Sequence, residues 1–233
     1  MLNPPIIPNT TKDVQEVIAV PHYIKHGNEF VLLPEGESFS LLSKQQQDFK
    51  RILDILSASF GLIFLSPLLL YVAVRTKFSG SIFYFQERIG KNGKPFLMIK
   101  FRSMVEHAEK NGPQLSSEED NRITPWGKIM RRWRLDELPQ LWNILKGDMS
   151  LIGPRPEREF FIQQIIAKYP HYKNLQQVKP GLSSWGMVQF GYAENVEEMI
   201  DRSRYDFYYQ QNNSLFFDVK VVLGTLGVIL TGK

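Results

Sequence analysis

The chemistry that this sequence can support centres on two adjacent carboxylates, Asp136 and Glu137. Arginines flank the pair, with Arg131 before it and Arg155 after it. A guanidinium group near a carboxylate favours the ionised form, which a nucleophile or a metal ligand requires. The simpler alternative is an aspartate that caps a helix, beside a glutamate that makes surface ion pairs.

A short amphipathic helix is predicted directly after the pair. Its apolar residues follow the spacing i, i+3, i+4 and i+7, at Leu138, Leu141, Trp142 and Leu145. Pro139 is tolerated only in the first turn of a helix, so the helix should start close to Asp136. Gly147 should end it. Both carboxylates are therefore expected at the positive end of a helix dipole and in their ionised form.

Arg155 lies between Pro154 and Pro156 in the sequence GPRPE. Two prolines restrict the backbone around the arginine, so its side chain has little entropy to lose when it binds a ligand. A rigid, bidentate clamp for a phosphate group is the functional interpretation. A simple turn is the alternative.

Residues 79–104 are predicted to form a β-hairpin. Two runs rich in aromatic and branched residues flank Asn92–Gly93, which is a strong turn signal. Polar residues interrupt these runs at Gln86, Glu87, Arg88, Lys100 and Arg102. They either face a ligand that carries phosphate or form a solvated face of the hairpin.

The most apolar segment runs from Ile55 to Val74 and contains no charged residue. Twenty helical residues span about 30 Å, which is the thickness of the hydrocarbon core of a bilayer. Ser66–Pro67 interrupts the segment, and a proline there bends a helix. Basic residues flank both ends and favour the cytoplasmic side for each. A kinked spanning helix and a re-entrant hairpin both fit this pattern; a buried soluble helix fits it less well.

Composition limits the classes of function. The chain has 233 residues, a net charge of +4 and no cysteine, so disulfides and thiolate metal sites are excluded. P-loop and Rossmann fingerprints are absent, and the basic excess suits anionic partners such as phosphates or a lipid surface. Residues 1–46 show no secretory signal and are expected to form an extension. The apolar tail, residues 215–230, is expected to be an interfacial or docked helix.

Three segments, taken in order, resemble one known family: FQERIGKNGKPFLMIKFRSM, RITPWGKIMRRWRLDELPQLWNILKGDMSLIGPRPE and KPGLSSWG. They are similar to the bacterial sugar transferases, which are monotopic polyprenyl-phosphate phosphoglycosyl transferases. The resemblance covers residues 47–233. It implies an α+β, mostly helical membrane protein with a re-entrant membrane helix hairpin, a small β-hairpin and interfacial amphipathic helices.

The same resemblance divides the chain into an N-terminal extension (1–46), a re-entrant membrane hairpin (47–78) and a cytoplasmic catalytic domain (79–233). Larger members of the family carry an N-terminal membrane domain of four helices. The extension does not resemble it, so a minimal form of the enzyme is expected.

The activity that the resemblance implies is transfer of a sugar-1-phosphate from a UDP-sugar to polyprenyl (undecaprenyl) phosphate, with release of UMP. The implied route passes through a covalent aspartyl-phosphosugar and starts exopolysaccharide or surface-glycan synthesis. The implied location is the cytoplasmic face of the bacterial inner membrane. The implied partners are the lipid bilayer and downstream glycosyltransferases, with no nucleic acid.

The resemblance also assigns roles to residues. It implies Asp136 as the nucleophile, Glu137 as a ligand of Mg²⁺, and a break of the membrane hairpin at Ser66 and Pro67. Phosphate and other substrate contacts are expected from Arg131, Arg155, Asp148, Lys100, Arg102 and Lys179. Residues 182–189 read LSSWGMVQ where the family often reads ITGWAQV, so the contacts to the donor sugar stay open.

Two alternatives from other classes remain. One is a catalytically silent membrane protein that scaffolds glycan assembly. The other is a phosphohydrolase that cleaves nucleotide sugars without a lipid acceptor.

Overall fold

The computed structural model describes residues 23–26, 29–32, 42–110, 112–117 and 120–231. The chain divides into two compact units, residues 1–37 and 38–233. The first contains strands β1 (Tyr23–His26) and β2 (Glu29–Leu32), which pair antiparallel. The rest of the predicted extension up to residue 41 lies outside the described residues, and the first helix of the second unit begins at Lys44, two residues before the predicted boundary.

Two helices, α1 (Lys44–Phe64) and α2 (Ser66–Lys77), form the apolar segment. They are bent by 64° at Leu65, and Pro67 lies in the first turn of α2. A proline there lacks an N–H that a helix interior would need but a first turn does not. The Ser66 hydroxyl donates a hydrogen bond to the Ile63 carbonyl at 2.7 Å. The predicted break at Ser66–Pro67 is therefore confirmed.

The bent pair exposes a large apolar surface. Among the described residues, no single helix has the length and apolarity needed to cross a bilayer, whereas α1 and α2 taken together do. The exposed apolar side chains on these two helices include Ile52, Leu56, Phe60, Ile63, Phe64, Leu70, Tyr71 and Val74. Such a surface usually marks contact with a membrane or a protein partner.

The predicted β-hairpin is confirmed. Strands β3 (Phe83–Ile89) and β4 (Pro95–Phe101) pair antiparallel, with Tyr84 opposite Lys100. The connecting turn contains Asn92 and Gly93, both at positive φ. Side chains alternate across a strand, so Tyr84, Gln86 and Arg88 share one face of the hairpin while Phe83, Phe85 and Glu87 are exposed on the other.

The segment around the acidic pair differs from the prediction. Helix α3 (Pro125–Arg132) is followed by a 3₁₀ turn, Leu135–Glu137, and helix α4 (Gln140–Lys146) starts only after Pro139. The helix end at Gly147, with φ of 97°, is as predicted. Arg134 adopts a left-handed conformation between α3 and the turn, and this reverses the chain before Asp136.

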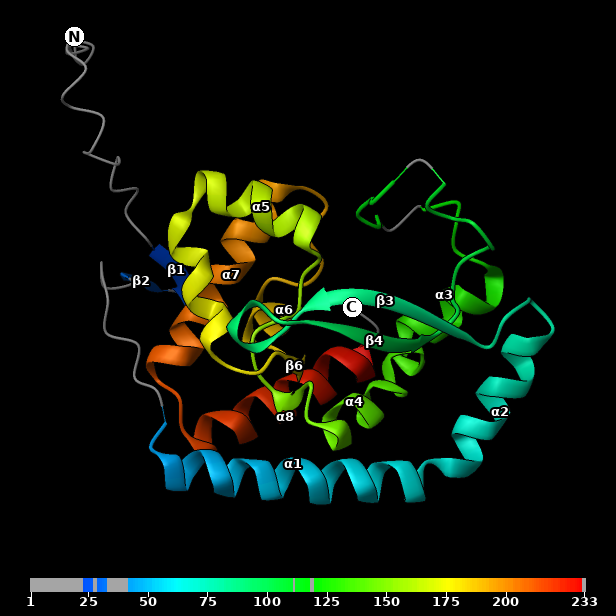
Figure 1. Cartoon of the computed structure of the whole chain (residues 1–233), viewed down its shortest axis with the longest axis horizontal. Coiled ribbons are helices and arrows are strands. Elements are labelled where there is room, and N and C mark those ends of the chain that lie inside the picture. The colour runs from blue at the N-terminus through cyan, green and yellow to red at the C-terminus, as the bar shows by residue number, and fades with distance from the viewer. Residues whose placement is uncertain (1–22, 27–28, 33–41, 111, 118–119, 232–233) are drawn as a thin grey trace, which may run out of the picture. The chain divides into compact units, whose positions relative to one another are not determined.

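The remaining helices and strands complete the second unit, residues 38–233. Strand β5 (Ser150–Ile152) pairs parallel with β6 (Gly181–Ser183). Helices α5 (Glu159–Lys168), α6 (Trp185–Gln189), α7 (Val196–Gln211) and α8 (Leu215–Thr231) follow, with a 3₁₀ stretch at Pro170–Gln177. In Figure 1 the hairpin β3–β4 lies between α5 at the top and α1 at the bottom.

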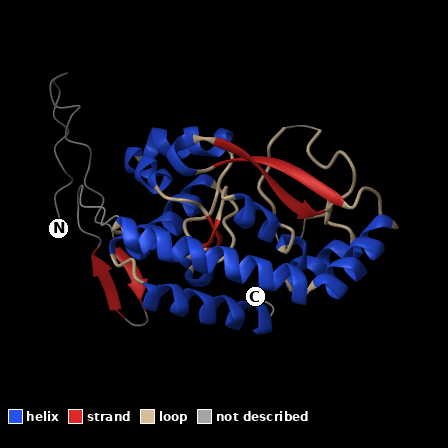
Figure 2. Ribbon diagram, turned by 60° about the horizontal axis from the view of Figure 1, so that its bottom comes forward, coloured by secondary structure: helices blue, strands red, loops and turns tan. Residues whose placement is uncertain are grey.

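Polar side chains of α1 bind helices α8 and α4 and strand β5. Lys50 forms an ion pair with Asp218 of α8, and α8 runs beside α1 in both views (Figures 1 and 2). Arg51 donates to the carbonyls of Ile144 and Leu145, at 2.6 and 2.7 Å, where the C-terminal end of α4 attracts a cation. Asp54, 5% exposed, binds β5.

We expect Asp54→Ala to lower the free energy of unfolding by about 2–3 kcal/mol. One oxygen, Oδ1, accepts both from the Leu151 N–H at 2.8 Å and from the Ser150 hydroxyl at 3.0 Å. Asp54→Asn keeps an oxygen at that position and should cost about 1 kcal/mol or less. Denaturant unfolding in detergent, followed by circular dichroism, measures both. Equal losses would contradict an acceptor role for Oδ1.

Candidate active site

A pocket of about 480 Å³ opens beside the inner face of the hairpin. Asp136 and Glu137 lie in its wall, each 6% exposed. The loop after β4 lines part of it through residues 103–105, 107–110 and 114–116. Cationic side chains converge on it from the hairpin, α3, the loop after β5 and α7: Arg88, Lys100, Arg102, Arg131, Arg155, Arg158 and Arg202. A cavity with this lining suits an anionic ligand.

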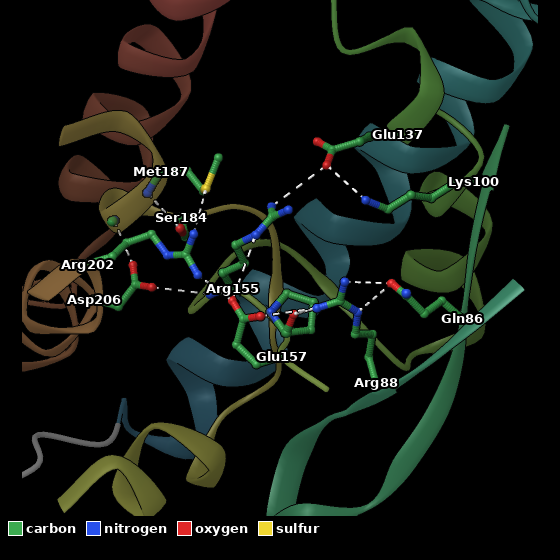
Figure 3. Close-up of polar contacts among 12 residues, drawn as sticks. Gln86, Arg88, Lys100, Glu137, Arg155, Glu157, Ser184, Met187, Arg202 and Asp206 are labelled. Atoms are coloured by element: carbon green, nitrogen blue, oxygen red, sulfur yellow. Dashed lines mark hydrogen bonds and ion pairs between the residues drawn. The ribbon is translucent and has the colours of Figure 1, made fainter. Parts of the chain in front are cut away.

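Glu137 is held by three cations. Its Oε1 lies 3.3 Å from the Lys100 ammonium and 3.7 Å from the Arg155 guanidinium, as Figure 3 shows. Its Oε2 lies 3.4 Å from Arg134. Burial acts to raise the pKa of Glu137, but Lys100, Arg155 and Arg134 outweigh burial, so the pKa falls well below its usual value. Glu137 is ionised, as the sequence predicted.

Asp136 lies in an environment that favours ionisation less than that of Glu137. Burial, and then the negative charge of Glu137, raise its pKa above the usual value. Lys100, Arg131 and Arg134 act in the opposite direction without cancelling these effects. The raised pKa disfavours the ionised form that the sequence led us to expect for Asp136. One more positive charge beside the pair would favour its ionised form.

Arg155 reaches the pocket from the loop after β5. This loop lies so close to β6 that a Cβ on Gly181 would be only 2.2 Å from the backbone nitrogen of Gly153. Only glycine therefore fits at position 181. The Arg155 backbone N–H donates to Asp206 at 3.3 Å, and its guanidinium carbon lies 5.9 Å from the centre of the Tyr192 ring. The guanidinium thus points between Glu137 and Glu157 (Figure 3).

The structure gathers part of the predicted set. Arg131 lines the pocket and donates to the hydroxyls of Ser103 and Ser116, at 3.0 and 2.6 Å. Arg102 lines it with its guanidinium 5.7 Å from the Tyr84 ring centre. Asp148 and Lys179 do not line it. Asp148 pairs with Lys146 at 3.1 Å, and Lys179 lies beside Arg51, whose charge, after burial, lowers its pKa.

Comparison with known proteins identifies the family of this chain. Residues 45–232 match the family described as bacterial sugar transferase. The chain belongs to the bacterial sugar transferase family. The match covers the bent helix pair, the β-hairpin, the acidic pair and the helices up to α8.

Three curated relatives show the range of the family. The chain is 43% identical over 203 residues to the UDP-N-acetylgalactosamine-undecaprenyl-phosphate N-acetylgalactosaminephosphotransferase of Aeromonas hydrophila, covering 86% of this chain and 48% of the relative. It thus spans about half the length of that relative. It is 39% identical to the UDP-glucose:undecaprenyl-phosphate glucose-1-phosphate transferase of Caulobacter vibrioides, covering 78% and 70%. It is 38% identical to the exopolysaccharide production protein ExoY of Sinorhizobium fredii, covering 79% and 86%.

The residues of the pocket can be compared with the known preferences of Mg²⁺. Among the described residues, no cluster of three or more His, Cys, Asp or Glu side chains has the arrangement of a metal site. Mg²⁺ does not need such a cluster, because it keeps several waters and is commonly held by one or two carboxylates together with substrate phosphates. Asp136 and Glu137 both line the pocket, and the repulsion between them is of the kind that a divalent cation relieves.

Sequence reasoning missed a buried network behind the pair. Glu157 accepts from Arg202 of α7 at 2.7 Å and from Arg88 of β3 at 3.1 Å (Figure 3). Asp206 accepts from the Gly186 N–H at 2.8 Å, and burial raises its pKa to about 6. The signal available in the sequence was Glu157, two residues after Arg155 in GPRPE. Nothing local links it to Arg202.

We expect Arg202→Met to lower the free energy of unfolding by about 3–5 kcal/mol, because it leaves a buried carboxylate short of a partner. Arg202 and Glu157 have side chains 6% and 7% exposed. Lys168→Met is the matched control, since its ion pair with Glu197 is exposed on both sides and should lower the free energy of unfolding far less. Similar losses in the two variants, measured by denaturant unfolding, would contradict a structural role for the network.

Proposed function

We propose that this protein transfers a sugar-1-phosphate from a UDP-sugar to undecaprenyl phosphate and releases UMP. The observation that carries the proposal is a buried acidic pair in the wall of a cationic pocket. The relatives from Aeromonas hydrophila and Caulobacter vibrioides, whose names state this type of reaction, support it. The product would pass to downstream glycosyltransferases that extend a surface glycan.

The pocket suits the diphosphate of the donor. Arg155 and Lys100 already lie within 4 Å of Glu137, so a phosphate placed beside the pair would meet both cations. Arg131 adds a further cation, held in place by two serine hydroxyls. These groups would offset the repulsion between the diphosphate and the acidic pair.

Asp136 is the proposed nucleophile. Its carboxylate oxygen attacks the phosphorus that carries the sugar, and the bond from that phosphorus to the bridging oxygen breaks, so UMP leaves with the electron pair. An oxygen of the polyprenyl phosphate then attacks the same phosphorus and frees the Asp136 carboxylate. Each step forms and breaks one phosphorus–oxygen bond, so one site can serve a soluble donor and a lipid acceptor in turn.

Glu137 is the proposed ligand of Mg²⁺, which would neutralise phosphate charge when bound. Asp136 must be ionised to attack, whereas burial and Glu137 raise its pKa. The arginines and Lys100 supply part of the positive charge that ionisation of the Asp136 carboxyl group needs. Ionised Glu137 would supply a carboxylate oxygen as a ligand of the cation.

We also propose that α1 and α2 form a re-entrant membrane hairpin at the cytoplasmic face of the bacterial inner membrane. The 64° bend, the exposed apolar side chains and the basic residues at both ends of the pair support this location. The polar contacts of Lys50, Arg51 and Asp54 would then keep the pocket next to the bilayer surface.

Purified protein in lipid nanodiscs with Mg²⁺ and undecaprenyl phosphate is expected to release UMP from one or more UDP-sugars. Asp136→Asn should lower the rate by about 10³-fold or more, because the amide is a poor nucleophile. Asp201→Asn, on the exposed side of α7, is the control and should keep the wild-type rate. Removal of Mg²⁺ with EDTA should also stop turnover. A rate near wild type in Asp136→Asn would contradict its proposed role.

Omission of the lipid separates the alternatives in the same assay. The proposed transferase should release at most one UMP per enzyme and then stop, because the phosphosugar stays on Asp136. A phosphohydrolase would continue to release UMP, and a silent scaffold would release none with or without lipid.

The location has its own prediction. The chain has no cysteine, so Gln45→Cys in the first turn of α1 and Ser79→Cys after α2 each provide a unique label. Both should react with a membrane-impermeant maleimide in inverted vesicles and be protected in spheroplasts. Reaction of one position from each side would replace the re-entrant hairpin with a spanning segment.

A further inference from the structure

A second cavity, of about 170 Å³, adjoins the acidic pair. It lies between α8, α6 and the strand pair β5–β6, and we call it the α8 groove. Its walls are mostly aliphatic: Leu138, Leu151, Ile152, Leu182, Met187, Val188, Val222, Leu226, Val228 and Ile229. Arg134 and Glu137 also line it, and Glu137 lines the cationic pocket as well. Glu137 is thus reached from two cavities of different character.

We propose that the α8 groove binds the isoprenoid units next to the phosphate of the polyprenyl acceptor, and that Arg134 binds this phosphate. This inference rests on the proposed function and adds a separate site for the acceptor. The donor would occupy the cationic pocket, and the acceptor phosphate would approach Glu137 from the groove.

The walls of the groove accept an apolar chain without stranding polar groups. Ser183 and Thr225 line it, but their hydroxyls hydrogen-bond to each other, and Thr225 also bonds the Val221 carbonyl at 2.8 Å. An aliphatic occupant therefore leaves these groups satisfied. A nucleotide sugar, by contrast, would place hydroxyls and phosphates against aliphatic walls and lose their hydrogen bonds to water.

Arg134 provides the cation at the end of the groove. Its guanidinium lies 3.4 Å from Glu137 Oε2 and 5.4 Å from the centre of the Tyr192 ring, and its side chain is 12% exposed. Tyr192 lines the cationic pocket, so Arg134 lies where the two cavities meet. The backbone of Arg134 is left-handed, which is rare for a residue with a side chain. This backbone conformation sets the direction in which the Arg134 side chain leaves the chain.

The groove continues into an apolar surface. Leu226 lines it and is 50% exposed, while Leu223 and Leu230 of the same helix are 63% and 76% exposed. An isoprenoid chain could thus leave the groove along α8 and enter a bilayer, with its phosphate retained at Arg134. An acyl chain of a phospholipid would also match the walls; the acidic pair beside Arg134 favours the reacting lipid as the occupant.

Photo-crosslinking tests the occupant directly. A polyprenyl phosphate that carries a diazirine in its first isoprene units is irradiated with the protein in nanodiscs of phosphatidylglycerol and phosphatidylethanolamine. Mass spectrometry should find the label within residues 182–188 and 222–229. Undecaprenyl phosphate should compete, and a tenfold excess of phosphatidylglycerol should not. Label confined to α1 and α2, or equal competition by phosphatidylglycerol, would overturn the proposal.

A kinetic pair tests the role of the groove. Leu226→Trp should fill it and raise the KM for undecaprenyl phosphate by about tenfold or more, with the single release of UMP in the absence of lipid unchanged. Phe216→Trp, at an exposed position of α8 that does not line the groove, is the control and should leave that KM unchanged. An unchanged KM in Leu226→Trp, or an equal rise in both, would overturn the proposal. A wild-type protein that releases no UMP would defeat the proposed function instead, whereas crosslinking would still report on the groove.

Discussion

Two adjacent carboxylates that are both buried repel each other, and this repulsion is the constraint on which the site depends. Lys100 from β4, Arg134 before the 3₁₀ turn and Arg155 after β5 surround Glu137 and keep it ionised. Asp136 receives less of this compensation, and its pKa is raised. The pair is therefore short of positive charge, and a phosphate ligand that arrives with a divalent cation would complete it.

The scaffold holds these cations through long-range contacts. The hairpin presents Lys100 and Arg88 on one face, while Glu157 joins Arg88 to Arg202 of α7. On the other side, α1 binds α4, β5 and α8 through Arg51, Asp54 and Lys50. Movement of α1 relative to β5 would disturb the loop that carries Arg155. The proposed membrane element and the acidic pair are thus parts of one packed unit.

Local signals in the sequence predicted local structure. The Ser66–Pro67 break, the Asn92–Gly93 turn and the stop at Gly147 each depend on a few neighbouring residues, and all are confirmed. The helix predicted to start close to Asp136 begins only at Gln140, because a 3₁₀ turn precedes α4. Ionisation of Asp136 and the Glu157–Arg202 pair depend on burial and on contacts distant in sequence, which spacing does not reveal. Spacing also does not reveal which motif residues reach the pocket: Asp148 and Lys179 belong to the motif segments but lie outside the pocket.

The central claim is that Asp136 becomes esterified to the phosphosugar of the donor. Mass spectrometry of the intact protein, after incubation with a UDP-sugar and Mg²⁺ but no lipid, tests it most directly. We expect a mass increase equal to one phosphosugar, mapped to Asp136 and lost when undecaprenyl phosphate is added. An adduct on another residue, or turnover without any adduct, would contradict it.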